Sequence, residues 1–302
     1  MKLIQWTIFL DMLGYGHKNS TIKNNEDANK FITFMEENKN WLVLQEDNQE
    51  LKKQYKKEAF NLYQYYDVKF TFISDSIVFS MVPKEVEVTL DEKLYFLHSA
   101  NVLFIAAIRI FNLMFFALAK EKIFIRGGIS SKYCNIKNEF AVGEGLIEAY
   151  RLESETAIYP RILLSKEITD NSKIMESLKW ISKKMYNSNY LIKKDEDGFF
   201  YLDYLKYRIS QSDTSSQSIQ QNGLKDMRKF LQGVKEVSSY LLFHKTIIEE
   251  NLIKFKEKIN TSKDKETKEK YQEILKKYEW SKNYHNQVLE TFPKYREAKI
   301  NI

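Results

Sequence analysis

The chain has 302 residues, of which 43% are hydrophobic and 14% aromatic, a content that excludes intrinsic disorder and allows one large core and a second, smaller one. The net charge of +6 is spread over interleaved lysines and glutamates, which is typical of solvated helix faces, so we expect no nucleic-acid partner. A single cysteine, Cys134, excludes an internal disulfide and a cysteine-based zinc site, and favours a reducing, cytoplasmic location.

Strand and helix patterns alternate from the N-terminus. Residues 2–10 are a continuous apolar, β-branched run that predicts a first strand rather than a signal peptide. Residues 26–37 predict a helix with acidic residues in its first turn, whereas the charged, tyrosine-rich insertion 41–66 has no assigned structure. Two β-rich runs around a Ser-Asp-Ser break then predict a hairpin over 68–82.

A long apolar helix is predicted at 92–119, followed by a strand that ends in Gly127 and Gly128 and a helix at 144–156. The apolar helix contains Asn and Arg, and its uninterrupted apolar runs are shorter than the roughly 20 residues of a membrane span, so we interpret it as a buried helix and expect no membrane association. The order βαββαβ predicts an α+β fold with a ferredoxin-like sheet and helices on one face.

Two domains are expected. Residues 1–165 contain the βαββαβ pattern and form the first domain. Residues 166–302 contain a mixed segment, a Ser/Gln-rich stretch at 209–223 and long C-terminal helices that we expect to pack on the core.

Two aspartates carry the candidate chemistry. Asp11 ends the first strand and Asp75 lies at the tip of the predicted hairpin, and each alone is typical of an ordinary turn. In a ferredoxin-like sheet, however, these two points are neighbours, and two converging carboxylates favour a bound divalent cation, Mg²⁺ or Mn²⁺. Two such ions about 4 Å apart would activate a hydroxyl and hold a leaving oxygen in phosphoryl transfer.

The loop after Asp11 is a candidate phosphate-binding segment. Its glycines free backbone N–H groups that could hold a polyphosphate ahead of a helix. The residues assigned to it are Met12, Leu13, Gly14, Tyr15 and Gly16.

Four short motifs, taken in order, carry a resemblance to a known family. The chain resembles the class III nucleotidyl cyclases, and among them the bacterial Pycsar anti-phage pyrimidine cyclases, which include uridylate cyclases. The resemblance covers roughly residues 1–165 and rests on "FLDMLGYG" (9–16), "ISDSIVFS" (73–80), "IRGGIS" (125–130) and "FAVGEGLIEAYRLES" (140–154).

The resemblance implies that Asp11 and Asp75 bind two Mg²⁺ or Mn²⁺ ions. The 3′-hydroxyl of a nucleoside triphosphate would attack its own α-phosphate, releasing pyrophosphate and a 3′,5′-cyclic nucleotide. It places Gly127 and Gly128 across the floor of the nucleotide pocket, and leaves Arg126 either to bind phosphate or to pair with an acid.

The last motif supplies the third expected catalytic residue. Members of the family commonly carry Asn-x-x-x-Arg here, with both side chains stabilising charge on the α-phosphate. The arginine corresponds to Arg151, whereas the asparagine position holds Ile147, so one donor is missing or replaced. The alternative for Arg151 is a surface ion pair with Glu148 or Glu155.

Base recognition is assigned by the same alignment. The lysine and acid with which adenylate cyclases of this class read adenine correspond to Thr71 and Phe140. Neither is charged, which favours a pyrimidine, uracil before cytosine, held by a hydroxyl and an aromatic ring. The alternative is that both are sheet residues that point into the core.

The resemblance also implies a homodimer in which each active site combines the metal ligands of one subunit with the arginine of the other. The C-terminal helices would then pack on the core or brace the dimer. Two other functions remain open: a palm-type synthase of a cyclic or linear oligonucleotide, and a non-catalytic nucleotide sensor, which Ile147 favours.

Overall fold

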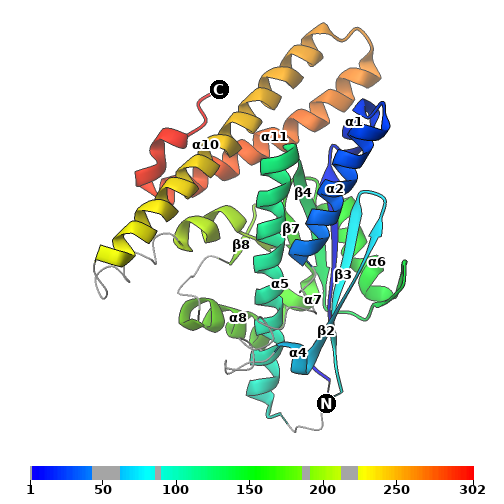
Figure 1. Ribbon diagram of the computed structural model, residues 1–302, viewed down its shortest axis with the longest axis vertical. Helices are drawn as coiled ribbons and strands as arrows, with labels where there is room; N and C mark the ends of the chain where they lie inside the picture. Colours follow the sequence, from blue (N-terminus) through cyan, green and yellow to red (C-terminus); the bar gives the residue numbers. More distant parts are fainter. Residues whose placement is uncertain (1, 43–61, 86–89, 186–190, 212–223) are drawn as a thin grey trace. The chain divides into compact units, whose positions relative to one another are not determined.

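The computed structural model describes residues 2–42, 62–85, 90–185, 191–211 and 224–302 (Figure 1). The chain forms two compact units, Met1–Tyr186 with Leu191–Leu202, and Asn187–Tyr190 with Asp203–Ile302. The first unit therefore continues past the boundary expected at residue 165, because later strands extend the same sheet.

A seven-stranded mixed sheet with the order β2-β3-β1-β4-β7-β9-β8 forms the centre of the first unit. Its first four strands pair antiparallel, in the order of a ferredoxin-like βαββαβ unit, and only β7 joins its neighbour β4 in parallel. The expected mixed α+β architecture is confirmed. The strands are β1 (Trp6–Leu13), β2 (Tyr66–Ile73), β3 (Ser76–Pro83), β4 (Phe124–Ser130), β7 (Ile162–Leu164), β8 (Ile192–Lys194) and β9 (Phe200–Leu202).

The remaining elements of this unit are helices and a small hairpin. The helices are α1 (Tyr15–Thr21), α2 (Asn25–Leu42), α4 (Leu62–Tyr65), α5 (Glu92–Glu121), α6 (Glu144–Arg151), the π-helical turn η1 (Leu152–Thr156), α7 (Lys166–Thr169) and α8 (Ser172–Met185). The hairpin pairs β5 (Asn135–Lys137) with β6 (Phe140–Val142). Of the insertion 41–66, residues 43–61 lie outside the described part, as do 212–223 of the Ser/Gln-rich stretch.

Strand β1 is buried on both faces, which explains its unbroken apolar sequence. On one face, Trp6 donates a hydrogen bond from Nε1 to the carbonyl oxygen of Ser99 in α5 (2.9 Å). On the other face, Phe9 packs in a cluster with Ala149 of α6. Helices α5 and α6 thus cover opposite faces of the sheet, whereas the sequence predicts helices on one face only.

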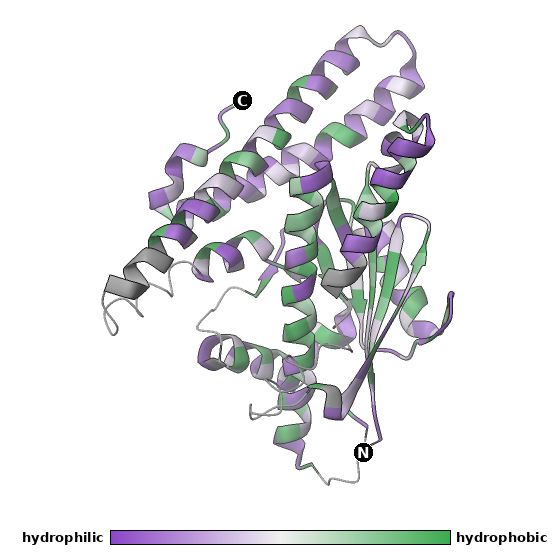
Figure 2. Cartoon of the chain, in the orientation of Figure 1, coloured by the Kyte–Doolittle hydropathy of each residue, from purple (hydrophilic) through white to green (hydrophobic). Residues whose placement is uncertain are grey.

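Helix α5 is a capped core helix. The Asp91 carboxylate accepts a hydrogen bond from the Leu94 N–H, and Lys122 ends the helix in a left-handed conformation (φ 55°). Among the described residues it is the one helix long and apolar enough to cross a membrane, but 67% of its most apolar stretch is buried. Figure 2 shows this helix and the strands as predominantly hydrophobic. Its burial is that of a core helix, as expected.

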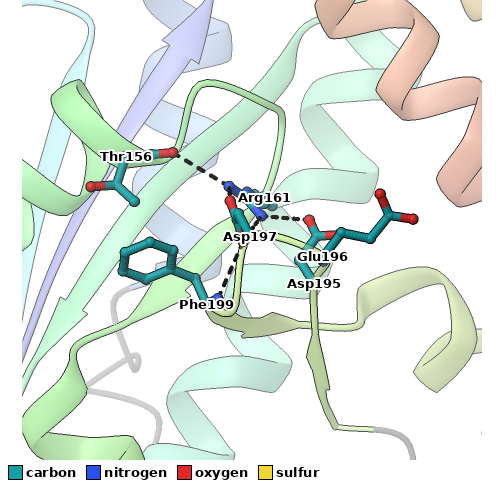
Figure 3. A network of polar contacts seen from close by, with 6 residues as sticks. All are labelled: Thr156, Arg161, Asp195, Glu196, Asp197 and Phe199. Carbon is teal, nitrogen blue, oxygen red and sulfur yellow. Dashed lines mark hydrogen bonds and ion pairs between the residues drawn. The ribbon is translucent and has the colours of Figure 1, made fainter.

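An arginine ties the β8–β9 hairpin to the strand β7. Arg161 is 1% exposed and pairs with both Asp195 and Asp197 in the turn that joins the two strands (Figure 3). Its guanidinium also donates to the carbonyl oxygen of Thr156 (3.4 Å). A buried guanidinium held by two carboxylates fixes the turn to the end of η1.

The second unit is helical. It contains a helix at 204–211, α10 (Leu224–Thr261), α11 (Lys265–Thr291) and the 3-10 turn η2 (Pro293–Ala298). Helices α10 and α11 form an antiparallel pair, and Asp264 caps α11 by accepting from the Thr267 N–H (2.7 Å).

A chain of buried hydrogen bonds joins the helices of this second unit. His285 Nε2 lies 2.8 Å from the carbonyl oxygen of Ala298, so Nε2 carries the proton and Nδ1 accepts. His244 Nδ1 then donates to His285 Nδ1 (3.0 Å), and His244 Nε2 accepts from the Tyr204 hydroxyl (2.8 Å). Both imidazoles are therefore neutral, and His285 joins α11 to α10 and to the turn η2.

Candidate functional site

Antiparallel register brings the two aspartates together. Asp11 of β1 lies opposite Ser76, the first residue of β3, and Asp75 immediately precedes Ser76 in the two-residue turn from β2. Ser74 makes this tight turn possible by adopting a left-handed conformation (φ 57°). This register places the two aspartates close enough for the charge of Asp75 to act on Asp11.

Two further charged side chains lie beside Asp11. Arg126 of β4 lies opposite Asp11 on its other side, and its Nε donates a hydrogen bond to Asp11 Oδ2 (3.2 Å). The same Nε lies 2.5 Å from Oε1 of Glu153. The side chains of Asp11, Arg126 and Glu153 are only 15%, 20% and 4% exposed, so this is a largely desolvated cluster.

The pKa values of the carboxyl groups in this cluster are shifted. Burial raises the pKa of Asp11, the Arg126 charge opposes this, and the negative charge of Asp75 raises the pKa of Asp11 again. Burial raises the pKa of Glu153 to about 7 against the opposing effect of Arg126, and Asp11 adds to the rise. These mutual effects indicate that Asp11 and Glu153 share a poorly solvated space that the charge of Asp75 also reaches.

Glu153 was not among the residues expected here. It lies in η1, where helix α6 widens into a π-helical turn closed by a hydrogen bond from the Ala157 N–H to the Leu152 carbonyl (2.6 Å). This widening turns the side chain of Glu153 toward the sheet. The sequence predicts one continuous helix over 144–156, on which an acid at 153 carries no distinguishing signal.

The predicted phosphate-binding segment is divided between two elements. Met12 and Leu13 complete β1, and Met12 is buried. Gly14 is left-handed (φ 90°) and precedes α1, which contains Tyr15 and Gly16. Cβ atoms built on Gly14 and Gly16 would meet no neighbouring atom, so this turn has open space beside it.

The paired glycines of β4 serve packing within the chain. A Cβ on Gly127 would lie 2.3 Å from the Phe9 carbonyl oxygen, and one on Gly128 would lie 2.3 Å from that of Ala149. The sequence interpretation placed a nucleotide pocket over these residues. The close approach that they permit is instead that of β1 and α6.

Arg151 does not take part in the cluster of Asp11, Arg126 and Glu153. It is exposed at the end of α6, lines a hollow of about 280 Å³ with Lys132 and Glu155, and neither aspartate lines that hollow. It forms no ion pair with any residue in the described part of the chain, so the alternative of a surface pair is not seen. Ile147, one turn earlier on the same face, is 51% exposed.

Exposed apolar side chains occur on α6 and on the segments that precede it. They are exposed by half or more and come from α6, from β6 and from the loop before β5. These residues are Tyr133, Phe140, Val142, Ile147 and Tyr150. Of these, Ile147 lines the same hollow as Arg151, and an arginine beside an exposed apolar side chain is suited to contact with another protein surface.

The two residues assigned to base recognition differ in exposure. Thr71 is 4% exposed and lies opposite Val78, in the row that continues to Phe9, beneath α6 and the β5–β6 hairpin. Phe140, on that hairpin, is 74% exposed. Thr71 thus takes the core position that was its alternative reading, whereas Phe140 is accessible to a ligand.

Comparison with known proteins finds a weak likeness among solved structures. No family model matches the sequence, and no curated protein matches it significantly. Among solved structures, the crystal structure of the guanylyl cyclase Cya2 is similar with a TM-score of 0.32 and 10% sequence identity, covering 66% of this chain and 90% of that one. A likeness at this level does not decide the activity.

Asp11 and Asp75 together fit a magnesium site of the kind in which the substrate supplies the remaining ligands. No group of three or more His, Cys, Asp or Glu side chains in the described part of the chain is arranged to hold a metal ion by itself. Mg²⁺, however, is commonly bound through one or two carboxylates together with substrate phosphates. Asp11 and Asp75 could supply the two carboxylates; burial is the main cause of the raised pKa of Asp11, and the negative charge of Asp75 adds to the rise.

Proposed function

We propose that the first unit is the catalytic domain of a nucleotidyl cyclase, which converts a nucleoside triphosphate into a 3′,5′-cyclic mononucleotide and pyrophosphate. The observation that carries this proposal is the proximity of Asp11, which lies opposite Ser76, to Asp75 in the preceding turn of a βαββαβ sheet, beside Arg126. The resemblance of the four sequence motifs to class III cyclases supports the same conclusion.

Asp11 and Asp75 would hold Mg²⁺ or Mn²⁺. When bound, these ions supply a lowered pKa for the attacking hydroxyl and charge stabilisation for the leaving oxygen. In the reaction, the 3′-oxygen forms a bond to the α-phosphorus, the bond from that phosphorus to the bridging oxygen breaks, and the 3′-hydroxyl proton is lost to solvent. Arg126, beside Asp11, is placed to contact a phosphate group with its remaining guanidinium N–H groups.

A second copy of the chain completes the site in this proposal. Arg151 is exposed, unpaired among the described residues and separate from the aspartates, so it would act on the α-phosphate held by the partner subunit. The exposed side chains of Ile147 and Tyr150 on the same helix as Arg151 support a protein interface there. The proposed assembly is therefore a homodimer with two shared sites.

The substrate is proposed to be UTP, with CTP as the second choice. The support is the absence of a charged pair at Thr71 and Phe140, together with the exposed ring of Phe140, on which a base could stack. A cytoplasmic signalling role in anti-phage defence rests on the resemblance to the Pycsar cyclases alone.

The direct test is to incubate the purified protein separately with ATP, GTP, CTP and UTP in the presence of Mn²⁺ and to identify the products by mass. A cyclic mononucleotide from UTP or CTP is the expected product. A linear or cyclic oligonucleotide would instead show a palm-type synthase.

Asp75→Ala is the matched loss-of-function variant and should abolish turnover without unfolding the protein. Asp67→Asn is its control, because Asp67 lies on the same hairpin and pairs with Lys84 (2.8 Å) away from the site. Full activity in Asp75→Ala would exclude the two-metal mechanism.

A nucleotide sensor is the second candidate. It is favoured by Ile147, which places an exposed apolar side chain where the family commonly has an asparagine that stabilises the transition state. This candidate predicts triphosphate binding by calorimetry with no product from any of the four nucleotides.

A further inference from the structure

Arg126 lies between the carboxylates of Asp11 and Glu153, and its contacts with the two differ. Its Nε donates a hydrogen bond to Asp11 Oδ2 at 3.2 Å. The Glu153 Oε1 atom is nearer, at 2.5 Å, yet it is buried and makes no hydrogen bond of acceptable geometry with any described group. Arg126 is therefore held by both carboxylates, and Glu153 already lies at ion-pair distance from the guanidinium without forming a hydrogen bond to it.

The hydrogen bond from Arg126 puts a positive charge beside Asp11, which is the carboxylate that would bind a divalent cation in the proposed function. While Arg126 donates to Asp11, that carboxylate is already neutralised, and a divalent ion must compete with the guanidinium. Moving a guanidinium away from a desolvated carboxylate is costly unless another negative group receives it. Glu153 is the adjacent buried carboxylate that can do so.

We propose that Arg126 is an internal counter-ion for Asp11, and that Glu153 is the positioning residue that takes over the guanidinium when a divalent cation binds Asp11. This inference rests on the proposed function, because it assumes that Asp11 is a cation ligand. It assigns to Glu153 a role in cation loading, one that depends on Arg126 and not on contact with the nucleotide.

The proposal predicts opposite effects for the two partners. Glu153→Gln keeps the size of the side chain but removes its charge, so Arg126 stays on Asp11 and the dissociation constant for Mn²⁺ rises about tenfold, the equivalent of one charge-assisted hydrogen bond. Arg126→Gln frees Asp11, and Mn²⁺ binds several times more tightly. In the Arg126→Gln background, Glu153→Gln has no further effect.

The measurement is Mn²⁺ binding to the full-length protein by electron paramagnetic resonance, without nucleotide, so that no turnover is needed. Glu155→Gln is the matched control: Glu155 lies on the same π-helical turn but is exposed, and its loss should leave Mn²⁺ affinity unchanged. Circular dichroism and thermal unfolding establish that each variant is folded.

Two results would overturn the inference: an unchanged Mn²⁺ affinity in Glu153→Gln, or an equal loss in the presence and absence of Arg126, which would mean a plain charge effect. If Glu153→Gln does not fold, Glu153→Asp decides, because its shorter side chain keeps the charge but withdraws from Arg126. Weakened binding then supports the inference and unchanged binding overturns it. A wild-type protein that binds no Mn²⁺, with or without UTP, contradicts the proposed function itself.

Discussion

Gly128 lies directly beneath Ala149: a Cβ built on Gly128 would be 2.3 Å from the Ala149 carbonyl oxygen and 2.6 Å from Cβ of Leu152. Helix α6 therefore rests on β4 with its backbone in contact. This contact sets the distance of α6 and η1 from the sheet. That distance in turn allows the Glu153 side chain to contact Arg126.

Gly128→Ala should lower the free energy of unfolding by about 1–3 kcal/mol or more, because the added methyl group has backbone atoms, not flexible side chains, as its neighbours. Urea denaturation of the full-length protein measures this. Gly16→Ala is the stability control, since a Cβ there meets no atom within 4 Å and the residue is helical. Equal stability of the two variants would contradict the close contact seen at Gly128.

The sheet could be predicted from the sequence because its signals are local. The apolar run that ends at Asp11, the hairpin around Asp75 and the long apolar helix each have a period or a turn residue that identifies them, and their order then fixes the ferredoxin-like arrangement. The convergence of the two aspartates follows from that order alone.

The positions of Arg126 and Glu153 could not be predicted in the same way. Sequence leaves Arg126 with two choices, phosphate or an acid, and the structure pairs it with two acids. Glu153 reaches the site only because the helix widens after Arg151, and a π-helical turn has no reliable sequence signal. Gly127 and Gly128 likewise predict that something approaches the β4 backbone closely, but the sequence does not show that β1 and α6 do so.

The Arg161 cluster gives the second prediction. Arg161→Met should lower the free energy of unfolding by about 3 kcal/mol, because it leaves the carboxylates of Asp195 and Asp197 without their buried counter-ion. Guanidinium chloride or urea denaturation measures the change. The triple variant Arg161→Met, Asp195→Asn, Asp197→Asn should recover part of the loss, and failure to recover any of it would mean that packing, not charge, dominates.

The histidine pair gives a third prediction, on acid stability. Burial lowers the pKa of His285 to about 4, with the charge of Lys245 adding to the effect, and burial also lowers the pKa of His244. Because the folded state keeps the rings neutral while the unfolded state takes up protons below about pH 6.5, stability is full above that pH. It should fall as the pH drops from about 6.5 to 4, by on the order of 3 kcal/mol for His285 alone.

Thermal unfolding at a series of pH values checks the histidine prediction. His285→Gln is the test variant, since an amide can accept from His244 and donate to the Ala298 carbonyl oxygen without titrating. Its stability should depend less steeply on pH between 6.5 and 4 than that of the wild type. An identical dependence would show that other groups control the acid transition.

The fourth prediction concerns the shared active site. Asp75→Asn and Arg151→Ala should each be inactive alone, since one removes a cation ligand and the other the arginine that is exposed and separate from the aspartates. If the two groups act across a dimer, a heterodimer of the variants contains one complete site. An equal mixture should therefore regain roughly a quarter of the wild-type turnover, because half of randomly formed dimers are heterodimers with one site of two.

The mixture is measured after the variants are unfolded and refolded together, so that subunits exchange, with each variant refolded alone as the control. Product mass, with the nucleotide that the wild type converts, is the readout. A mixture that stays inactive while forming dimers would mean that Asp75 and Arg151 serve the same subunit.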